Sequence, residues 1–206
     1  MYRIQWLNKI ESIKERYDFS LGYHLLYCPW STIQDSSVAF ISLNPGRSID
    51  KSTQKISEEK GNSYKIAENN SISPITKQFL ELCKFLGKLP EEILTGTIHP
   101  FRSNNWNSLS NEQKNIGLKI GQEFWSEALL KVDLIICVGN VTANTIIKML
   151  DFKINTTVAS GWGNIKLKRY KNYKQQTLVH LPHLSTFRLF SRNECRGPLT
   201  QVFERS

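Results

Sequence analysis

The sequence contains four cysteines, which are spread along the whole chain as Cys28, Cys83, Cys137 and Cys195. There is no C-x-x-C pair and no cysteine–histidine cluster with the spacing of a zinc site. Cys83 and Cys137 fall within apolar periodic segments, which is typical of buried cysteines. We therefore expect no disulfide, no metal site and no bound cofactor.

Long apolar segments are absent as well. No run of about 18 apolar residues occurs, so no membrane-spanning helix is expected. The first residues, from Met1 to Trp6, lack the apolar core and the small-residue cleavage site of a secretory signal. The sequence therefore predicts a cytoplasmic protein with no membrane partner.

Basic residues exceed acidic ones, with 27 Lys and Arg against 18 Asp and Glu and a net charge of +9. Such an excess favours a polyanionic partner through counterion release, although many basic proteins bind none. The hydrophobic content of 40% and the charged content of 22% are ordinary for a folded protein. A chain of 206 residues suits one domain with a full core.

Strands and helices are predicted to alternate along the chain. Short apolar runs of β-type residues predict strands over residues 36–43, 94–98, 132–138 and 177–180. Helical spacing predicts helices over residues 1–17, 74–87, about 109–130 and 141–150, and a last helix near Pro198. Residues 49–72 are polar and aperiodic, which predicts a long loop or an excursion with short helices. The alternation indicates an α/β fold with three α/β/α layers and a central, mainly parallel four-stranded sheet.

Polar loops follow three of these strands, at residues 44–48, 99–105 and 180–188. Ligands of such sheets bind at the carboxyl ends of the strands, so the chemistry is expected where these loops meet. In the last loop His180 ends a strand that Pro182 stops, and His183, Leu184 and Arg188 follow. An imidazole, an apolar wedge and a cation are the parts that hold a nucleic-acid backbone and flip a base. A plain surface loop after an edge strand is the alternative.

Two of these loops resemble motifs of the uracil-DNA glycosylase superfamily. Ser42-Leu43-Asn44-Pro45-Gly46 occupies the position of the family's strand ending in G-x-[DN]-P, and its N-P-G form resembles the mismatch-specific uracil/thymine branch. The family's H-P-S-P-L-S-x-Y-R-G-F motif can be laid without gaps on residues 180–190. His180, Leu184, Ser185, Arg188 and Phe190 then match, and Phe187 replaces the Tyr. Residues 100–104, the helix of Glu112 and the strand over residues 133–140 resemble the family's central part, so the resemblance covers about residues 38–190.

The sequence also departs from the family pattern. Leu181 and Pro182 stand where the motif has Pro and Ser, and His183 replaces a Pro. The base-reading Asn of true uracil enzymes has no clear counterpart, since Thr97 or Ile98 falls near its place. The cysteine spacing of the iron–sulfur branches is absent. The resemblance therefore supports a glycosylase more strongly than it supports uracil as the substrate.

The resemblance implies a single uracil-DNA-glycosylase-like domain over residues 1–206, with an N-terminal helix within about 1–20 and a family-like core over about 36–206. It implies a monofunctional DNA glycosylase that flips a base and hydrolyses its glycosidic bond without a metal. Asn44 would orient the attacking water, although an amide is a poor base. His180 would stabilise the departing base. The alternatives are a turn-capping Asn44 and a structural His180.

Further residues are assigned from the same resemblance and from their loops. Leu184 is expected to fill the stack that the flipped base leaves. No role is assigned to His24, which lies in an irregular, aromatic-rich segment over residues 21–30. The base pocket is expected to contain Pro45, Gly46, Tyr64, Thr97, His99 and Phe101, and the DNA contacts are expected from Arg47, Ser48, Arg102, His183, Leu184, Ser185 and Arg188.

Several functions stay open at this level. The excised base is uracil, another deaminated or mismatched base such as thymine, or a modified pyrimidine such as those of phage DNA. The last substrate would indicate antiviral defence in place of repair. A non-catalytic DNA-binding protein on the same fold is the remaining alternative. In each case the expected partner is DNA, duplex and also single-stranded, and the protein is expected to act as a monomer.

Overall fold

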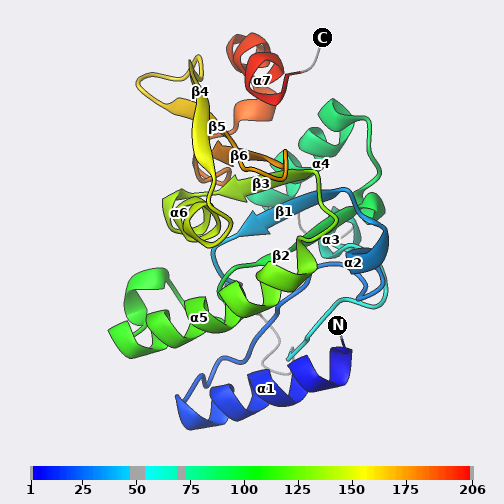
Figure 1. The fold of residues 1–206 in the computed structure, drawn as a ribbon, viewed down its shortest axis with the longest axis vertical. Helices are drawn as coiled ribbons and strands as arrows, with labels where there is room; N and C mark the ends of the chain where they lie inside the picture. Colours follow the sequence, from blue (N-terminus) through cyan, green and yellow to red (C-terminus); the bar gives the residue numbers. More distant parts are fainter. Residues whose placement is uncertain (1, 47–53, 69–72, 205–206) are drawn as a thin grey trace.

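A computed structural model of the chain describes residues 2–46, 54–68 and 73–204. Its strands form one six-stranded mixed sheet in the order β2-β1-β3-β6-β5-β4 (Figure 1). The parallel part contains β2 (Ile93–Thr97), β1 (Val38–Ser42), β3 (Leu134–Val138) and β6 (Thr177–Leu181). An antiparallel hairpin, β5 (Lys166–Lys171) and β4 (Lys153–Ala159), extends the sheet beyond β6.

The α/β class and the four predicted strands are confirmed, but the predicted strand count is wrong. The sheet gains two strands because β4 and β5 form a hairpin from polar and basic residues. Their side chains are mostly solvent-exposed or half-buried, and only Val158 and Leu167 supply buried apolar contacts. A strand with so few apolar residues gives no alternating hydrophobic signal, so the sequence did not indicate this hairpin.

The predicted helices form close to their expected positions. The first 70 residues form α1 (Arg3–Arg16) and two short helices, α2 (Thr32–Asp35) and α3 (Ser63–Glu68). The longer helices are α4 (Pro74–Leu86), α5 (Asn111–Ala128), α6 (Asn140–Met149) and α7 (Arg196–Phe203). Gly87 ends α4 in the left-handed conformation, with φ 63°, as its position after the last apolar residue predicts. The helix α3 lies within the polar excursion, whose residues 49–53 and 69–72 are outside the described part of the chain.

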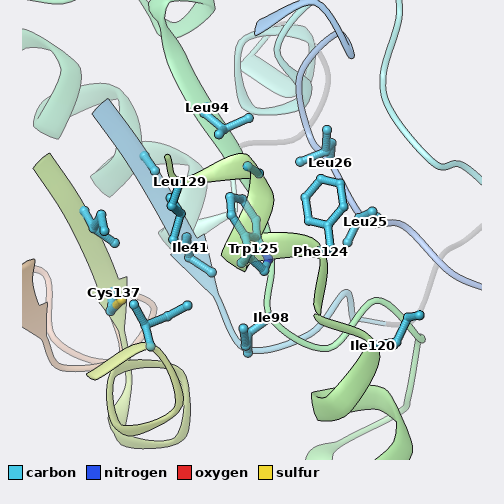
Figure 2. Packing of buried hydrophobic residues seen from close by; sticks show 14 of the residues in the cluster. Leu25, Leu26, Ile41, Leu94, Ile98, Ile120, Phe124, Trp125, Leu129 and Cys137 are labelled. Carbon is cyan, nitrogen blue, oxygen red and sulfur yellow. The ribbon is translucent and has the colours of Figure 1, made fainter. Parts of the chain in front are cut away.

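Helices cover both faces of the sheet, because alternate strand residues point to opposite sides. On one face α1, α5 and α6 pack on residues such as Ile41 and Leu94. On the other face α3, α4 and α7 pack on residues such as Phe40. Figure 2 shows Trp125 of α5 beside Ile41, with Phe124 next to it. Burial on both faces explains why the central strands consist of nearly continuous apolar runs.

The helix α5 lies very close to the carboxyl end of β2. A Cβ atom at Gly121 would lie 1.6 Å from the carbonyl oxygen of Ile98, so no larger residue fits there. The indole nitrogen of Trp125 donates a hydrogen bond to the carbonyl oxygen of Thr97 at 2.8 Å. These contacts fix the end of β2 inside the protein and leave the end of β1 to form the open site.

An extended segment over residues 23–28 runs along β2 and adds to that side of the sheet. The N–H of Tyr27 donates to Thr95 O at 2.8 Å, and the N–H of Thr97 donates to Leu25 O at 3.0 Å. This pairing brings His24 and Tyr27 to the carboxyl ends of the strands. The segment was predicted only as irregular and aromatic-rich, because its pairing partner lies some 70 residues away in sequence.

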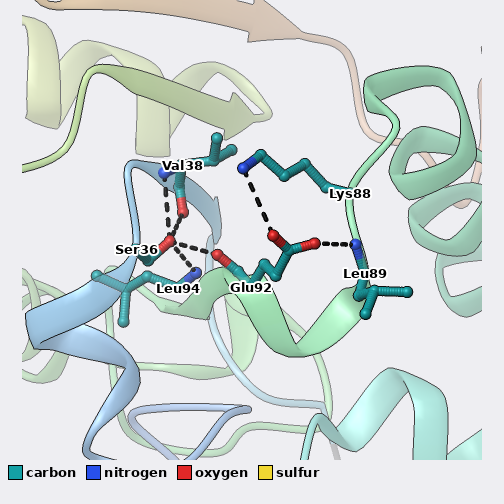
Figure 3. Close-up of polar contacts among 6 residues, drawn as sticks. All are labelled: Ser36, Val38, Lys88, Leu89, Glu92 and Leu94. Carbon is teal, nitrogen blue, oxygen red and sulfur yellow. Dashed lines mark hydrogen bonds and ion pairs between the residues drawn. The ribbon is translucent and has the colours of Figure 1, made fainter.

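The amino ends of β1 and β2 are joined by the hydroxyl group of Ser36 (Figure 3). Its Oγ accepts hydrogen bonds from the N–H groups of Val38 and Leu94, at 3.2 and 3.1 Å. The same hydroxyl lies 2.7 Å from Glu92 O, to which it donates. The Glu92 carboxylate in turn accepts from Leu89 N at 2.6 Å. One buried hydroxyl therefore satisfies backbone groups of two neighbouring strands.

We expect Ser36→Ala to lower the free energy of unfolding by about 1–3 kcal/mol, because it leaves buried backbone N–H groups without an acceptor. Urea denaturation measures the change. Ser37→Ala is the matched control, since Ser37 is only half-buried and its strand contacts are made by its backbone. Equal effects of the two substitutions would show that the Ser36 hydroxyl contributes little.

Candidate functional site

A cavity of about 900 Å³ opens at the carboxyl end of β1. It is formed by the loop after β1, the segment over residues 23–28, α3, the start of α4 and the loop over residues 102–106. Its position is the one where parallel sheets bind ligands. The side chains that matter for its chemistry are His24, Tyr27, Asn44, Ser63, Tyr64, Arg102, Trp106 and His183.

Asn44 lies in this cavity with a fixed orientation. Its Nδ2 donates hydrogen bonds to Ser103 Oγ at 2.8 Å and to Pro45 O at 3.2 Å. Within the described part of the chain, no donor bonds the amide oxygen Oδ1. Because both amide protons are used by the protein, the oxygen is left as an acceptor for a bound water or ligand.

His180 lies in a different cavity, of about 570 Å³, which also contains Asn140, Asn164 and Lys168. Burial and the neighbouring charge of Lys168 lower the pKa of His180 to about 4, so its imidazole is neutral at pH 7. Asn44 does not line this second cavity. Asn44 and His180 thus line two adjoining cavities, which share Leu43 and His183.

His183 lines both cavities, so of the two histidines in the last loop it is the one that shares a cavity with Asn44. Its Nδ1 lies 2.6 Å from the hydroxyl oxygen of Ser185. The N–H groups of Thr186 and Phe187 both donate to the His183 carbonyl oxygen, which closes a tight turn. Partial desolvation lowers the pKa of His183 below its ordinary value. The turn thus presents a held, neutral imidazole to the cavity.

Leu184 is fully buried, with 0% of its surface exposed, which contradicts its predicted role as an exposed wedge. It belongs to the core on the α4 and α7 face of the sheet. The tight turn after His183 directs this side chain inward, although its neighbours in sequence are polar. In this conformation Leu184 cannot enter a DNA duplex.

We expect Leu184→Ala to lower the free energy of unfolding by about 2–5 kcal/mol, as truncation of a buried Leu usually does. Denaturant unfolding measures this, with Leu130→Ala as the control because Leu130 is 64% exposed. Unchanged stability, with base excision slowed on duplex DNA alone, would show instead that Leu184 has the predicted role in flipping a base.

Three predicted base-pocket residues, Thr97, His99 and Phe101, are fully buried and do not line the cavity. The Thr97 hydroxyl donates to a backbone carbonyl oxygen at 3.0 Å. The nitrogens of His99 lie 3.3 and 3.1 Å from the carbonyl oxygens of Phe101 and Gln113. Phe101 stacks on Phe19, with ring centroids 3.8 Å apart. The prediction that these three residues form the base pocket is therefore wrong. They have structural roles, because α5 covers the end of β2.

Other predicted residues are closer to the expected place. Tyr64 and Gly46 line the cavity, whereas Pro45 is buried beside it. Arg102 also lines the cavity, and its Nη1 donates to Gly46 O at 2.9 Å. Of the predicted DNA-binding residues, Arg188 is exposed and Ser185 is engaged with His183. Arg47 and Ser48 lie outside the described residues.

The sequence interpretation missed His24, Tyr27 and Ser63, all of which line the cavity. His24 is 7% exposed, and its ring meets that of Tyr27 edge-on at 4.6 Å. Burial, together with the charges of Arg102 and Lys55, lowers the pKa of His24 to about 3. No short motif contains these residues. Their signal lay in the aromatic richness of residues 21–30, without a strand pattern that would place it.

Among residues 2–46, 54–68 and 73–204, no group of three or more His, Cys, Asp or Glu side chains is placed to hold a metal ion. All four cysteines are buried thiols. None of the described helices is long and apolar enough to cross a membrane. No family model matches the sequence, and no curated protein matches it.

Proposed function

We propose that this chain is a monofunctional DNA glycosylase, which hydrolyses the glycosidic bond of a flipped nucleotide and leaves an abasic site. The observation that carries the proposal is the shared cavity of Asn44 and His183 at the carboxyl end of β1. The motif resemblance of the β1 loop to the uracil-DNA glycosylase superfamily supports it independently. The mechanism needs no metal or lysine nucleophile.

Asn44 is assigned to the attacking water. Cleavage of an N-glycosidic bond develops positive charge on the sugar, and the water must be held on the face opposite the base. The Asn44 amide is anchored through Nδ2 by Ser103, so its oxygen can accept a hydrogen bond from a water in one defined position. Because an amide is a poor base, most of the catalysis must come from stabilisation of the leaving base.

His183 is assigned to the leaving base, in place of His180. When the Ser185 hydroxyl donates to Nδ1, the neutral ring carries its proton on Nε2. The lowered pKa keeps this neutral form at pH 7. An Nε2–H aimed at a pyrimidine oxygen stabilises the negative charge that develops there. We prefer His183 to His180 for this role because His183 lines the same cavity as Asn44.

The cavity walls and the charge of the chain fit a nucleotide. Tyr27, Tyr64 and Trp106 supply aromatic surface on which a base can stack. Arg102 at the wall and Arg188 on the adjoining loop supply cations for the phosphates. The net charge of +9 favours binding to the polyanion. We propose that the protein acts on DNA as a monomer.

The test is the release of abasic sites from a panel of oligonucleotides. The panel contains uracil, mismatched thymine, and hydroxymethylated and glucosylated pyrimidines, each in duplex and single-stranded form. A glycosylase should make at least one oligonucleotide of the panel sensitive to strand cleavage by alkali. The reaction should proceed in the presence of a metal chelator, and a mock purification should give no cleavage. Tight DNA binding without any release would instead indicate a non-catalytic DNA-binding protein. Release of a modified base alone would assign the protein to defence against phage DNA.

A further inference from the structure

Two buried polar atoms in the cavity have no hydrogen-bond partner among the described residues, His24 Nε2 and Ser63 Oγ. Leaving such an atom unpaired destabilises the folded protein, and native proteins pair nearly all of them. Both atoms belong to side chains that line the same cavity as Asn44. These unsatisfied hydrogen-bonding groups therefore indicate a ligand that pairs with them.

The environment of His24 determines which nitrogen carries its proton. Arg102 Nη2 lies 3.4 Å from His24 Nδ1, and a guanidinium can only donate. Nδ1 is therefore an acceptor. Because the pKa of His24 is lowered to about 3, the ring is neutral at pH 7, and its one proton must be on Nε2. The unpartnered atom is a hydrogen-bond donor.

The position of this donor is fixed by the surrounding structure. The His24 N–H donates to Pro100 O at 2.8 Å, and the His24 carbonyl oxygen accepts from the Thr97 hydroxyl at 3.0 Å. The ring rests edge-on against Tyr27. Ser63 is held through its own N–H, which donates to Tyr27 O at 2.7 Å. Both unpaired atoms are thus tied to one rigid stretch beside β2.

On the premise of the proposed glycosylase function, we propose that His24 Nε2–H and Ser63 Oγ are the groups that select the base. They hold a second acceptor oxygen of the flipped pyrimidine, besides the oxygen that His183 holds. That oxygen is either a keto group of the ring or a hydroxyl group on a substituent. The cavity, at about 900 Å³, is at the upper end of the range of ~300–1,000 Å³ for small-molecule sites, which leaves room for a substituent.

Unsubstituted cytosine is the base that this pair should reject. Its amino group would place a donor against the His24 donor, and a buried donor left unpaired discriminates strongly between substrates. We expect single-turnover excision of uracil, 5-hydroxymethyluracil or hydroxymethylated cytosine to exceed that of cytosine by on the order of 10²-fold. If uracil and 5-hydroxymethyluracil are preferred equally over cytosine, the oxygen that His24 and Ser63 hold is the keto oxygen of the ring. Preference for the hydroxymethylated bases, with or without glucose, would identify the substituent oxygen.

Two variants of His24 separate recognition from folding. His24→Gln places an amide N–H near the position of Nε2, whereas His24→Asn is too short to do so and retains a group only near Nδ1. We expect His24→Asn to reduce the preference over cytosine by about tenfold or more and His24→Gln to retain most of it. The preference is a ratio within one protein, so partial unfolding does not change it. A wild-type ratio in His24→Asn would overturn the proposal.

A second readout does not depend on catalysis. Nitrogen NMR of the histidine-labelled protein at pH 7 should show His24 protonated on Nε2, and free uracil or 5-hydroxymethyluracil should shift that resonance more than cytosine does. Protonation on Nδ1, or equal shifts with all three bases, would overturn the assignment. If the expected shifts occur while no DNA substrate releases a base, the recognition inference stands and the glycosylase proposal fails.

Discussion

His183→Ala should lower single-turnover base excision by on the order of 10²-fold or more, whereas His180→Ala should leave it within about threefold of the wild type. His180 lies in β6 and His183 follows that strand, and of these two residues only His183 shares a cavity with Asn44. Removing a donor that acts on developing charge costs mainly the chemical step. Rapid-quench measurement of product formation with excess enzyme measures that step.

Asn44→Ala belongs to the same experiment and should lower excision to a similar extent, because the water loses its fixed acceptor. DNA affinity, measured by fluorescence anisotropy, should change little in all three variants. The His180 variant is the matched control, since it removes the same ring three residues away. A large loss in His180→Ala together with a small loss in His183→Ala would contradict our assignment and return the catalytic role to His180.

The residue types of the last loop explain why the sequence assigned catalysis to His180 and an exposed position to Leu184, whereas we propose His183 for catalysis and the structure buries Leu184. His180 and Leu184 fit the family motif without gaps, and both follow a recognisable strand. The strand continues to Leu181 and a tight turn follows Pro182, so His183 reaches the cavity and Leu184 turns into the core. Which side chain faces outward depends on that turn. The turn is closed by backbone hydrogen bonds that leave no signature in residue type.

The sequence predicted the helices that bury one face and the strands that are buried on both faces. It did not predict the elements with few buried apolar residues. The run Val38–Ser42 is readily predicted as a buried strand, because it is apolar up to Ser42 and is followed by turn residues. The hairpin of β4 and β5 has no such run. The place of His24 depends on pairing between residues 23–28 and β2, which is long-range and made by backbone atoms. Contacts of that kind are decided by tertiary packing.

The two buried histidines His24 and His99 should make the protein sensitive to acid. Burial lowers their pKa values to about 3 and about 4, whereas an unfolded histidine titrates near 6.5. Between these values the unfolded chain binds more protons than the folded one, so stability falls as the pH falls. Above pH 6.5 the effect is absent. Each histidine contributes a slope of roughly 1.4 kcal/mol per pH unit between about pH 6 and 4.5.

We therefore expect the free energy of unfolding to fall by roughly 2.7 kcal/mol per pH unit in that window from these two residues alone. Urea denaturation at several pH values measures the slope. His180, whose pKa is also lowered to about 4, adds to the measured slope. His24→Gln and His99→Gln should each reduce that slope by roughly 1.4 kcal/mol per pH unit, because a neutral amide takes up no proton. The slope is the quantity compared, since both variants are expected to lose some stability at every pH. Parallel pH profiles in the wild type and both variants would show that the two rings are protonated inside the folded protein.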